Sequence, residues 1–282
     1  MRSIAWLSEK GGTGKTTSAV NTAACLAKLG RRVLVIDADP QGNATLVFLR
    51  GRPAEAPTLY HVLTGTADAT EAIRGTGTPG LDLLPADDQL ADANITLASE
   101  LARERRLRTA MRGVGESYEV VVIDTSPQRT LINVNVLNYA TEVFCPVDPG
   151  IFSIAGLVKL QGVIADVAKF LDNSALRLAG LVLTRTQRDN LTRDVEAQVR
   201  EAFGPLVCKT TIPASTRIGE AHARYLSVLD HARLSPAARA YEALTKEILE
   251  HGENHGIGSG IDGATSSDRA GRGARRSTRA AG

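Results

Sequence analysis

The chain has 282 residues, of which 43% are hydrophobic, 23% charged and only 4% aromatic. This length allows one or two domains with a buried core, and a net charge of +2 excludes a broadly basic nucleic-acid coat protein and an acidic tail protein. The three cysteines lie far apart in the chain, so they predict neither a disulfide framework nor a thiolate metal site. No apolar run approaches the roughly 20 residues of a membrane span, and we expect a cytoplasmic protein without a membrane partner.

Short apolar runs rich in β-branched residues recur along the chain, with room for helices between them. They lie at Ser3–Leu7, Val33–Ile36, Leu81–Leu84, Val120–Ile123, Glu142–Val147, Leu178–Leu183 and Leu206–Ile212. Because the runs are continuous rather than alternating, they are typical of strands buried on both faces, as in a parallel sheet. The alternation of strands and helices predicts an α/β fold with one doubly wound, mostly parallel sheet flanked by helices.

Several helices have boundaries that can be read from the sequence. The segment Thr16–Leu29 predicts a helix, and Gly30 follows it at the usual stop position. A last helix begins with Ser235 as its cap and a proline at its first position, and its apolar residues at helical spacing should dock on the sheet. The charged segment 99–108 is expected to form a further helix, with Leu101 among its inward-facing residues.

The end of the chain differs in composition from the rest. Residues 252–282 contain many glycines, serines and arginines and almost no apolar residues. Such a segment cannot bury enough surface to offset the entropy lost on ordering. We therefore expect a folded domain over residues 1–251 and a disordered tail over 252–282.

A glycine-rich loop joins the first predicted strand to the first predicted helix. From position 8 it reads Ser-Glu-Lys-Gly-Gly-Thr-Gly-Lys-Thr-Thr. Glycines let backbone N–H groups converge on phosphate oxygens, and the helix N-terminus adds a favourable dipole. In such a loop Lys15 would reach the β- and γ-phosphates of a nucleotide, and the Thr16 hydroxyl would ligate Mg²⁺. The segment predicts a nucleotide-binding loop rather than an ordinary strand–helix turn.

Two of the predicted strands end in aspartate. Asp37 and Asp39 follow the run that begins at Val33, and Asp124 follows the run that begins at Val120. A Mg²⁺–nucleotide site needs carboxylates at the ends of neighbouring strands, where they hold metal-bound waters and orient an attacking water. An apolar run that ends in aspartate is common, but together with the glycine-rich loop these carboxylates predict a magnesium site.

The glycine-rich loop resembles a known variant of the phosphate-binding motif. The usual motif has glycine where this chain has Glu9, and the segment Lys10–Thr16 matches the deviant Walker A motif of the ParA/MinD superfamily of P-loop NTPases. The segment Asp37–Thr45 is similar to the DxDPQGNAT stretch of ParA-type (Soj-like) DNA partition ATPases, and Asp124 takes the Walker B position. The resemblance covers residues 2–250, which is the expected folded domain.

The resemblance implies roles for individual residues. In the family an early lysine, here Lys10, reaches across a sandwich dimer to the phosphates of the partner subunit. Lys15 would stabilise phosphoryl charge with it, and Asp39 would orient the hydrolytic water. The implied nucleotide-binding residues are Lys10, Gly11, Gly12, Thr13, Gly14, Lys15, Thr16, Thr17 and Pro213. The implied magnesium-binding residues are Thr16, Asp37 and Asp124.

The resemblance also implies a function, that of a chromosome or plasmid partition ATPase with ATP and Mg²⁺ as cofactors. ATP binding would close a homodimer, the homodimer would bind double-stranded DNA without reading its sequence, and slow hydrolysis would release it. A ParB-like centromere-binding protein would accelerate that hydrolysis, and the protein would be nucleoid-associated. Arg217 matches a DNA-contacting arginine of the family and Arg188 falls near a second one. On the residue pattern alone, both arginines fit an ordinary solvated surface.

The chain departs from the family pattern in two places. After Asp124 it reads Thr-Ser-Pro-Gln-Arg-Thr over positions 125–130, where the family has a Pro-Pro pair followed by Ser-Leu-Gly, and Ala214 stands where the family has arginine. The first segment is the second switch of the family, so its coupling to dimerisation, DNA or a partner would differ here. Neither departure touches the predicted phosphate chemistry.

Two alternative functions stay open. One is a MinD-like surface-positioning ATPase, which needs a C-terminal amphipathic helix that this sequence does not predict. The other is a nucleotide-gated scaffold with little hydrolysis. Turnover in the presence of DNA and a partner would separate the scaffold from an active ATPase.

Overall fold

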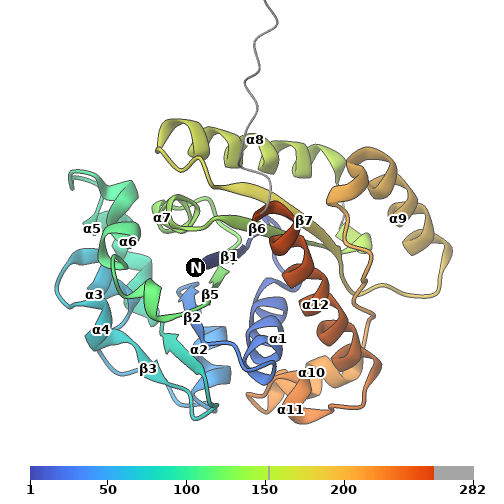
Figure 1. Ribbon diagram of the computed structural model, residues 1–282, viewed down its shortest axis with the longest axis horizontal. Coiled ribbons are helices and arrows are strands. Elements are labelled where there is room, and N and C mark those ends of the chain that lie inside the picture. Colours follow the sequence, from blue (N-terminus) through green and yellow to red (C-terminus); the bar gives the residue numbers. More distant parts are fainter. Residues whose placement is uncertain (152, 257–282) are drawn as a thin grey trace, which may run out of the picture.

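The computed structural model describes residues 1–151 and 153–256, and within them seven strands form one sheet in the order β3-β4-β2-β5-β1-β6-β7 (Figure 1). The strands are β1 (Arg2–Trp6), β2 (Val33–Ala38), β3 (Arg74–Gly75), β4 (Leu81–Leu84), β5 (Val120–Thr125), β6 (Glu142–Val147) and β7 (Arg177–Leu183). Every neighbouring pair is parallel except β3 with β4. The doubly wound, mostly parallel sheet predicted from the sequence is therefore confirmed.

Helices cover both faces of the sheet, as Figure 1 shows for α1 and α12 on one side and α7 and α8 on the other. The α-helices are α1 (Lys15–Lys28), α2 (Asn43–Phe48), α3 (Leu59–Thr64), α4 (Ala69–Ala72), α5 (Ala93–Thr96), α6 (Arg106–Ala110), α7 (Leu131–Tyr139), α8 (Ile154–Phe170), α9 (Asn190–Phe203), α10 (Thr216–Ala223), α11 (Val228–His231) and α12 (Pro236–Gly256). Short 3₁₀ helices occur at η1 (Asp88–Asp92), η2 (Arg103–Arg105), η3 (Gly115–Ser117), η4 (Pro149–Ile151) and η5 (Gly204–Leu206). None of the helices in the described residues is both long and apolar enough to span a bilayer.

The central strands are apolar throughout because they supply two separate cores. On β1, Ile4 and Trp6 pack into the core beneath α1 and α12, while Ala5 belongs to the core beneath α7 and α8. Successive side chains of a strand point to opposite faces of the sheet, so a strand buried on both faces needs apolar residues at every position.

The boundaries of the first and last helices follow the signals in the sequence. Gly30 has a φ of 81°, the left-handed conformation that commonly ends a helix, and α1 ends two residues before it. At the start of α12 the Ser235 hydroxyl accepts a hydrogen bond from the backbone N–H of Ala238, at 3.2 Å. The helix continues to Gly256, so residues 252–256 of the expected tail are helical, and the remainder of that tail, residues 257–282, lies outside the described residues.

The strand predicted at Leu206–Ile212 is not formed. This segment meets the β7 side of the sheet at separate points. A bridge joins Val207 to Leu181, a second bridge joins the next residue after the segment, Pro213, to Thr186, and the backbone N–H groups of Cys208 and Ile212 donate to the carbonyls of Leu181 and Leu183. Between the bridges, the backbone N–H groups of Lys209 and Thr210 donate instead to the carboxylate of Glu247 on α12, at 2.6 and 2.9 Å. The apolar residues that suggested a strand are buried beside β7, but a side chain of the last helix takes the hydrogen bonds that a strand would need.

The charged helix predicted at 99–108 is also different in the structure. A 3₁₀ turn at η2 precedes the short helix α6, and Ala102 has a positive φ of 53° that interrupts any longer helix. Leu101 is 90% exposed, so the expectation that it faces inward was wrong, whereas Leu107 is buried.

Candidate functional site

The glycine-rich loop lies at the carboxyl end of β1 and leads directly into α1. Gly12 and Gly14 have φ angles of 76° and 96°, which residues with a side chain rarely adopt. Gly14 immediately precedes α1, and no side chain among the described residues caps that end of the helix. The first-turn N–H groups of α1 therefore lack side-chain partners, which is the arrangement that binds a phosphate.

Residues that follow β7 hold the loop from one side. The Thr184 hydroxyl donates to the carbonyl of Thr13 at 2.9 Å, and the guanidinium of Arg185 lies 3.5 Å from the carbonyl of Gly12. Arg185 also pairs with Asp148, which follows β6, at 3.4 Å. The loop is thus shaped by its own glycines and braced by contacts from two neighbouring strands.

Lys15 is directed into the loop rather than to solvent. Its side chain is only 6% exposed, and Nζ donates to the carbonyl of Lys10 at 3.3 Å. Burial lowers the pKa of the Lys15 ammonium, and the nearby carboxylates of Asp124 and Asp39 partly oppose that shift. A cation held against the backbone of a glycine-rich loop suits the phosphates of a nucleotide.

Asp37 and Asp124 lie directly opposite each other on the paired strands β2 and β5. Both are fully buried. Asp37 accepts hydrogen bonds from the backbone N–H of Thr45 at 2.7 Å, from the Thr45 hydroxyl at 2.8 Å and from the backbone N–H of Asp39 at 3.2 Å. Burial nevertheless raises the pKa of Asp37 to about 6, because removing a carboxylate from water disfavours its charged form.

Asp124 accepts fewer hydrogen bonds than Asp37. One oxygen accepts from the backbone N–H of Thr125 at 3.0 Å, whereas Oδ2 has no hydrogen-bond partner among the described residues. Burial, and next the charge of Asp37, raise the pKa of Asp124 well above its usual value, while the Thr16 hydroxyl acts in the opposite direction. A buried carboxylate oxygen that lacks a partner beside a second carboxylate is a site where a cation would relieve the repulsion.

Asp39 completes the acidic side of the site. It follows β2, is almost completely buried, and accepts a hydrogen bond from the backbone N–H of Gln41 at 3.0 Å. In the described residues no group of three or more His, Cys, Asp or Glu side chains could hold a metal by itself. Mg²⁺ commonly takes most of its ligands from water and phosphate with only one or two protein groups, and the residues present fit that mode of binding.

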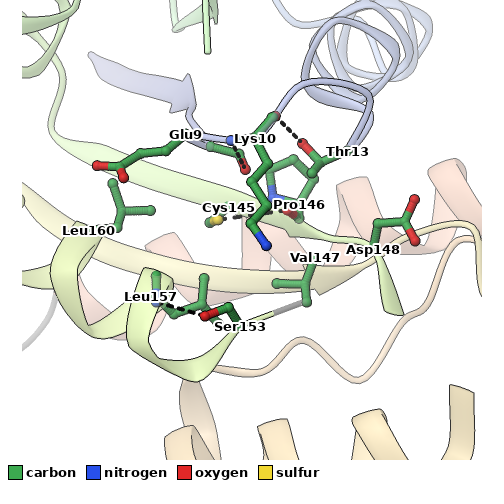
Figure 2. A pocket seen from close by; sticks show the side chains of 12 residues that line it. Glu9, Lys10, Thr13, Cys145, Pro146, Val147, Asp148, Ser153, Leu157 and Leu160 are labelled. Atoms are coloured by element: carbon green, nitrogen blue, oxygen red, sulfur yellow. Dashed lines mark hydrogen bonds between the residues drawn. The ribbon is translucent and has the colours of Figure 1, made fainter. Parts of the chain in front are cut away.

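Lys10 borders a cavity of about 200 Å³ between the loop, the end of β6 and the start of α8. In Figure 2 the Lys10 side chain runs from the loop into this cavity toward Val147, with Asp148 and Ser153 on the far wall. Glu9 points away from Lys10 in the same view. Lys10 therefore lies within its own protomer here, next to the loop that would hold the phosphates.

The two arginines expected to bind DNA lie outside this cluster. Arg188 is exposed in the turn before α9, and Arg217 is exposed in the first turn of α10, where it pairs with Glu220 at 2.7 Å. Pro213 is half-buried and forms an isolated β-bridge with Thr186, which directly follows the loop-contacting residues Thr184 and Arg185. The structure thus brings the loop, the three aspartates and the Pro213 segment to one end of the sheet and leaves Arg188 and Arg217 on the surface.

Sequence reasoning did not find three of the contacts at this site. Thr45, which holds Asp37, stands out in the sequence only as part of a motif, and Thr184 carries no signal in the sequence that links it to the loop. The third contact is an ion pair in which Arg129 Nε donates to Glu9 Oε1 at 2.6 Å. Glu9 and Arg129 both occupy positions where the sequence departs from the usual motifs, and these paired departures are the one feature of the sequence that points to their contact.

Comparisons with known proteins give a consistent result. A family model described as an AAA domain matches residues 1–178. The chain is 36% identical over 250 residues to the sporulation initiation inhibitor protein Soj of Bacillus subtilis, covering 88% of this chain and 98% of Soj. It is 38% identical over 252 residues to the chromosome partitioning protein ParA of Caulobacter vibrioides, covering 88% of this chain and 94% of ParA.

A solved structure supports the fold and bears on the site. Cobyrinic acid a,c-diamide synthase from Mycobacterium smegmatis, with bound ADP and magnesium, superposes with a TM-score of 0.78 at 29% identity, covering 90% of this chain and 96% of that one. The names of these similar proteins differ, and the matches cover 88–90% of this chain.

Proposed function

The chain belongs to the Soj/ParA family of chromosome-partitioning P-loop ATPases, and from that premise we propose that it segregates DNA through a cycle of ATP binding, dimerisation, DNA binding and hydrolysis. The observation that carries this proposal is the cluster at the carboxyl end of the sheet. There the buried Lys15, the paired carboxyl groups of Asp37 and Asp124, and Asp39 meet the glycine-rich loop.

ATP and Mg²⁺ are the proposed cofactors. The fold neighbour with bound ADP and magnesium supports this proposal. The loop N–H groups and Lys15 would bind the phosphates, and the Thr16 hydroxyl, Asp37 and Asp124 would hold the metal with its water shell. Bound Mg²⁺ would neutralise charge that develops on the phosphoryl oxygens.

Asp39 is the proposed orienting residue for the attacking water. Its Oδ1 is already engaged with the backbone N–H of Gln41, which fixes the carboxylate and leaves its second oxygen to accept a hydrogen bond from water. Lys15, together with Lys10 from the partner subunit, would stabilise the charge on the phosphoryl group. Hydrolysis would be slow until a partner protein completes this geometry.

The proposed active form is a homodimer in which Lys10 leaves its own cavity and reaches the phosphates of the partner subunit. The dimer would bind double-stranded DNA through phosphate contacts of Arg217 and Arg188, so its affinity would fall steeply with salt. A ParB-like centromere-binding protein is the proposed stimulator of hydrolysis, and the protein would be cytoplasmic and nucleoid-associated.

A nucleotide-gated scaffold is the second candidate. It is favoured by the altered segment after Asp124, because a different switch would alter the response to a partner. A chain that binds DNA with ATP but shows no turnover, with or without DNA and partner, would fit the scaffold better than the ATPase cycle.

The test is binding to a long duplex of arbitrary sequence with ATP, with ADP and without nucleotide, at low and high salt. We expect salt-sensitive binding only with ATP. Lys10→Ala should abolish it by removing the contact between subunits, and Arg217→Ala should weaken it roughly tenfold by removing a phosphate contact.

The matched control is Arg112→Ala, because Arg112 is also exposed but follows α6 on the opposite side of the sheet. It should bind DNA as the parent does. A parent that binds nucleotide but no DNA in any state would contradict the proposal, and binding to anionic vesicles would then favour a MinD-like surface-positioning role.

A further inference from the structure

The ion pair between Glu9 and Arg129 joins the phosphate-binding loop to the segment that follows β5. Arg129 donates to the same carboxylate oxygen of Glu9 with both Nε and Nη2. Glu9 stands where the usual phosphate-loop motif has glycine, and Arg129 lies in the segment 125–130 that departs from the family pattern. Two unusual residues, 120 positions apart, thus contact each other beside the nucleotide site.

The segment that carries Arg129 is anchored to α7. The side-chain amide of Asn133 donates to the carbonyls of Ser126 at 3.0 Å and Gln128 at 2.6 Å. The Thr130 hydroxyl caps the helix by accepting from the backbone N–H of Asn133 at 3.3 Å. Because the backbone on both sides of Arg129 is held by α7, the ion pair fixes Glu9 to a rigid part of the molecule.

Glu9 forms part of the boundary between two hollows. One is the cavity that contains Lys10, and the other is a largely apolar groove of about 350 Å³ along α7 and α8, which Arg129 also lines. In Figure 2 the Glu9 side chain points away from Lys10, and Lys10 points into the first cavity. Glu9 and Lys10 are joined by a planar peptide, so an ion pair that holds Glu9 also restricts the backbone that carries Lys10.

We propose that Arg129 is a positioning residue for Lys10: by holding Glu9, it keeps Lys10 in the cavity of its own protomer, and the ion pair opens when Lys10 extends to a partner subunit. This inference rests on the proposed dimer with Lys10 donated between subunits. Arg129 and Glu9 are 49% and 31% exposed, respectively. Such an exposed pair is weak enough to open during a binding event, and salt weakens it further.

The test measures dimer dissociation constants by sedimentation, with a slowly hydrolysed ATP analogue, for the parent, Glu9→Gln and Arg129→Gln. Each variant should dimerise about fivefold more tightly, because the separated protomer has lost a contact that the dimer does not keep. Nucleotide affinity of the monomer should be unchanged, and thermal stability should fall by no more than the loss of one exposed ion pair allows. In high salt the parent should approach the variants, since screening removes the same contact.

Two further chains distinguish this role from a general surface effect. The charge exchange Glu9→Arg with Arg129→Glu should return the dimer constant to the parental value. Arg31→Gln breaks the pair of Arg31 with Glu119, which has similar exposure but lies at the other end of β2, and it should change nothing.

The outcomes separate this inference from the proposed function. A parent that forms no ATP-dependent dimer would overturn both. A parent that dimerises, with Glu9→Gln and Arg129→Gln equal to it or weaker, would overturn the positioning role and leave the proposed function standing.

Discussion

The nucleotide end of the sheet buries its charged groups, whereas the helix α10 exposes them to solvent. At the sheet end, Asp37 and Asp124 are fully buried side by side. Burial raises the pKa of both carboxyl groups, and the charge of Asp37 raises that of Asp124 further. On α10, Arg217 is 57% exposed and its charge is shared with Glu220 at the surface. One region stores unfavourable electrostatic energy, and the other stores almost none.

This difference follows from what each region is proposed to bind. A metal–phosphate site must place a few charges with fixed geometry in a dry environment, where each interaction is strong. A surface that binds DNA of any sequence needs only mobile cations near phosphates, where each interaction is weak and screened by salt. Removing a charge should therefore have large effects at the sheet end and small ones on α10.

The largest effect is expected for Asp39→Ala. Without the carboxylate that orients water, turnover should fall by about 100-fold or more, because a positioned general base contributes at least that much. ATP binding should survive, since the loop and Lys15 are untouched. Turnover is measured as phosphate release under saturating ATP and Mg²⁺, and ATP affinity by titration calorimetry.

The control for this prediction is Asp88→Ala, an exposed aspartate at η1 away from the loop. It should keep parental turnover. If Asp39→Ala hydrolysed ATP at the parental rate, Asp39 would not orient the water.

Asp124→Asn is expected to stabilise the nucleotide-free protein. Neutralising one of two adjacent buried carboxyl groups should raise the unfolding free energy of the nucleotide-free protein by about 1–3 kcal/mol, because an uncompensated buried charge is removed. Asn keeps an oxygen for the Thr125 N–H, so the local geometry can survive. Denaturant melts with and without Mg²⁺–ATP measure the change.

The same melts separate stability from function. The parent should gain more stability from Mg²⁺–ATP than Asp124→Asn does, since the variant has lost a ligand for the metal's water shell. Asp88→Asn should leave both quantities unchanged. A destabilised Asp124→Asn would mean that the two carboxyl groups share a proton or a stronger contact in the nucleotide-free state.

The smallest effect concerns His222, on the inner side of the same helix that carries Arg217. Burial lowers the pKa of His222 below its usual 6.5, and its Nε2 has no hydrogen-bond partner in the described part of the chain. The unfolded chain then binds the proton more readily than the folded one. The contribution of His222 to stability is present above pH 6.5 and is lost as the pH falls through the folded-state pKa.

His222→Leu should therefore flatten the loss of thermal stability between pH 7 and pH 5, by roughly 1 kcal/mol or less. Melting temperatures across that range, for parent and variant, measure it. His231→Leu is the comparison variant. It removes a ring that contacts Glu220, whereas His222→Leu removes a ring whose Nε2 has no hydrogen-bond partner in the described residues. Parallel pH profiles for the parent and His222→Leu would contradict the prediction.

The sequence predicted the parts of the fold that depend on local signals. The bounds of β4 and β6 agree residue for residue with the predicted runs, and Gly30 ends α1 because its backbone conformation suits glycine. The phosphate loop could be located because glycine spacing, a lysine and a helix start have to occur together in any such loop.

Features that depend on distant contacts could not be predicted in the same way. Whether 206–212 becomes a strand is decided by Glu247, a residue some 40 positions later that takes two of its N–H groups. Leu101 looked like a core residue by its spacing, but the positive φ of Ala102 turns the chain before a helix can form. The pair of Glu9 with Arg129 needs the fold itself to bring the two together.

The segment held by Glu247 has a further consequence for how this protein behaves when many copies are crowded together. An unpaired strand at the edge of a sheet can pair with a strand from another chain, which is a common route to aggregation. Along β7 the segment around Val207 occupies that margin, and at the opposite margin β3 is only two residues long and carries Arg74. Within the described residues, neither edge of the sheet thus offers a long unpaired strand, so high local concentrations should not lead to edge-to-edge pairing of sheets.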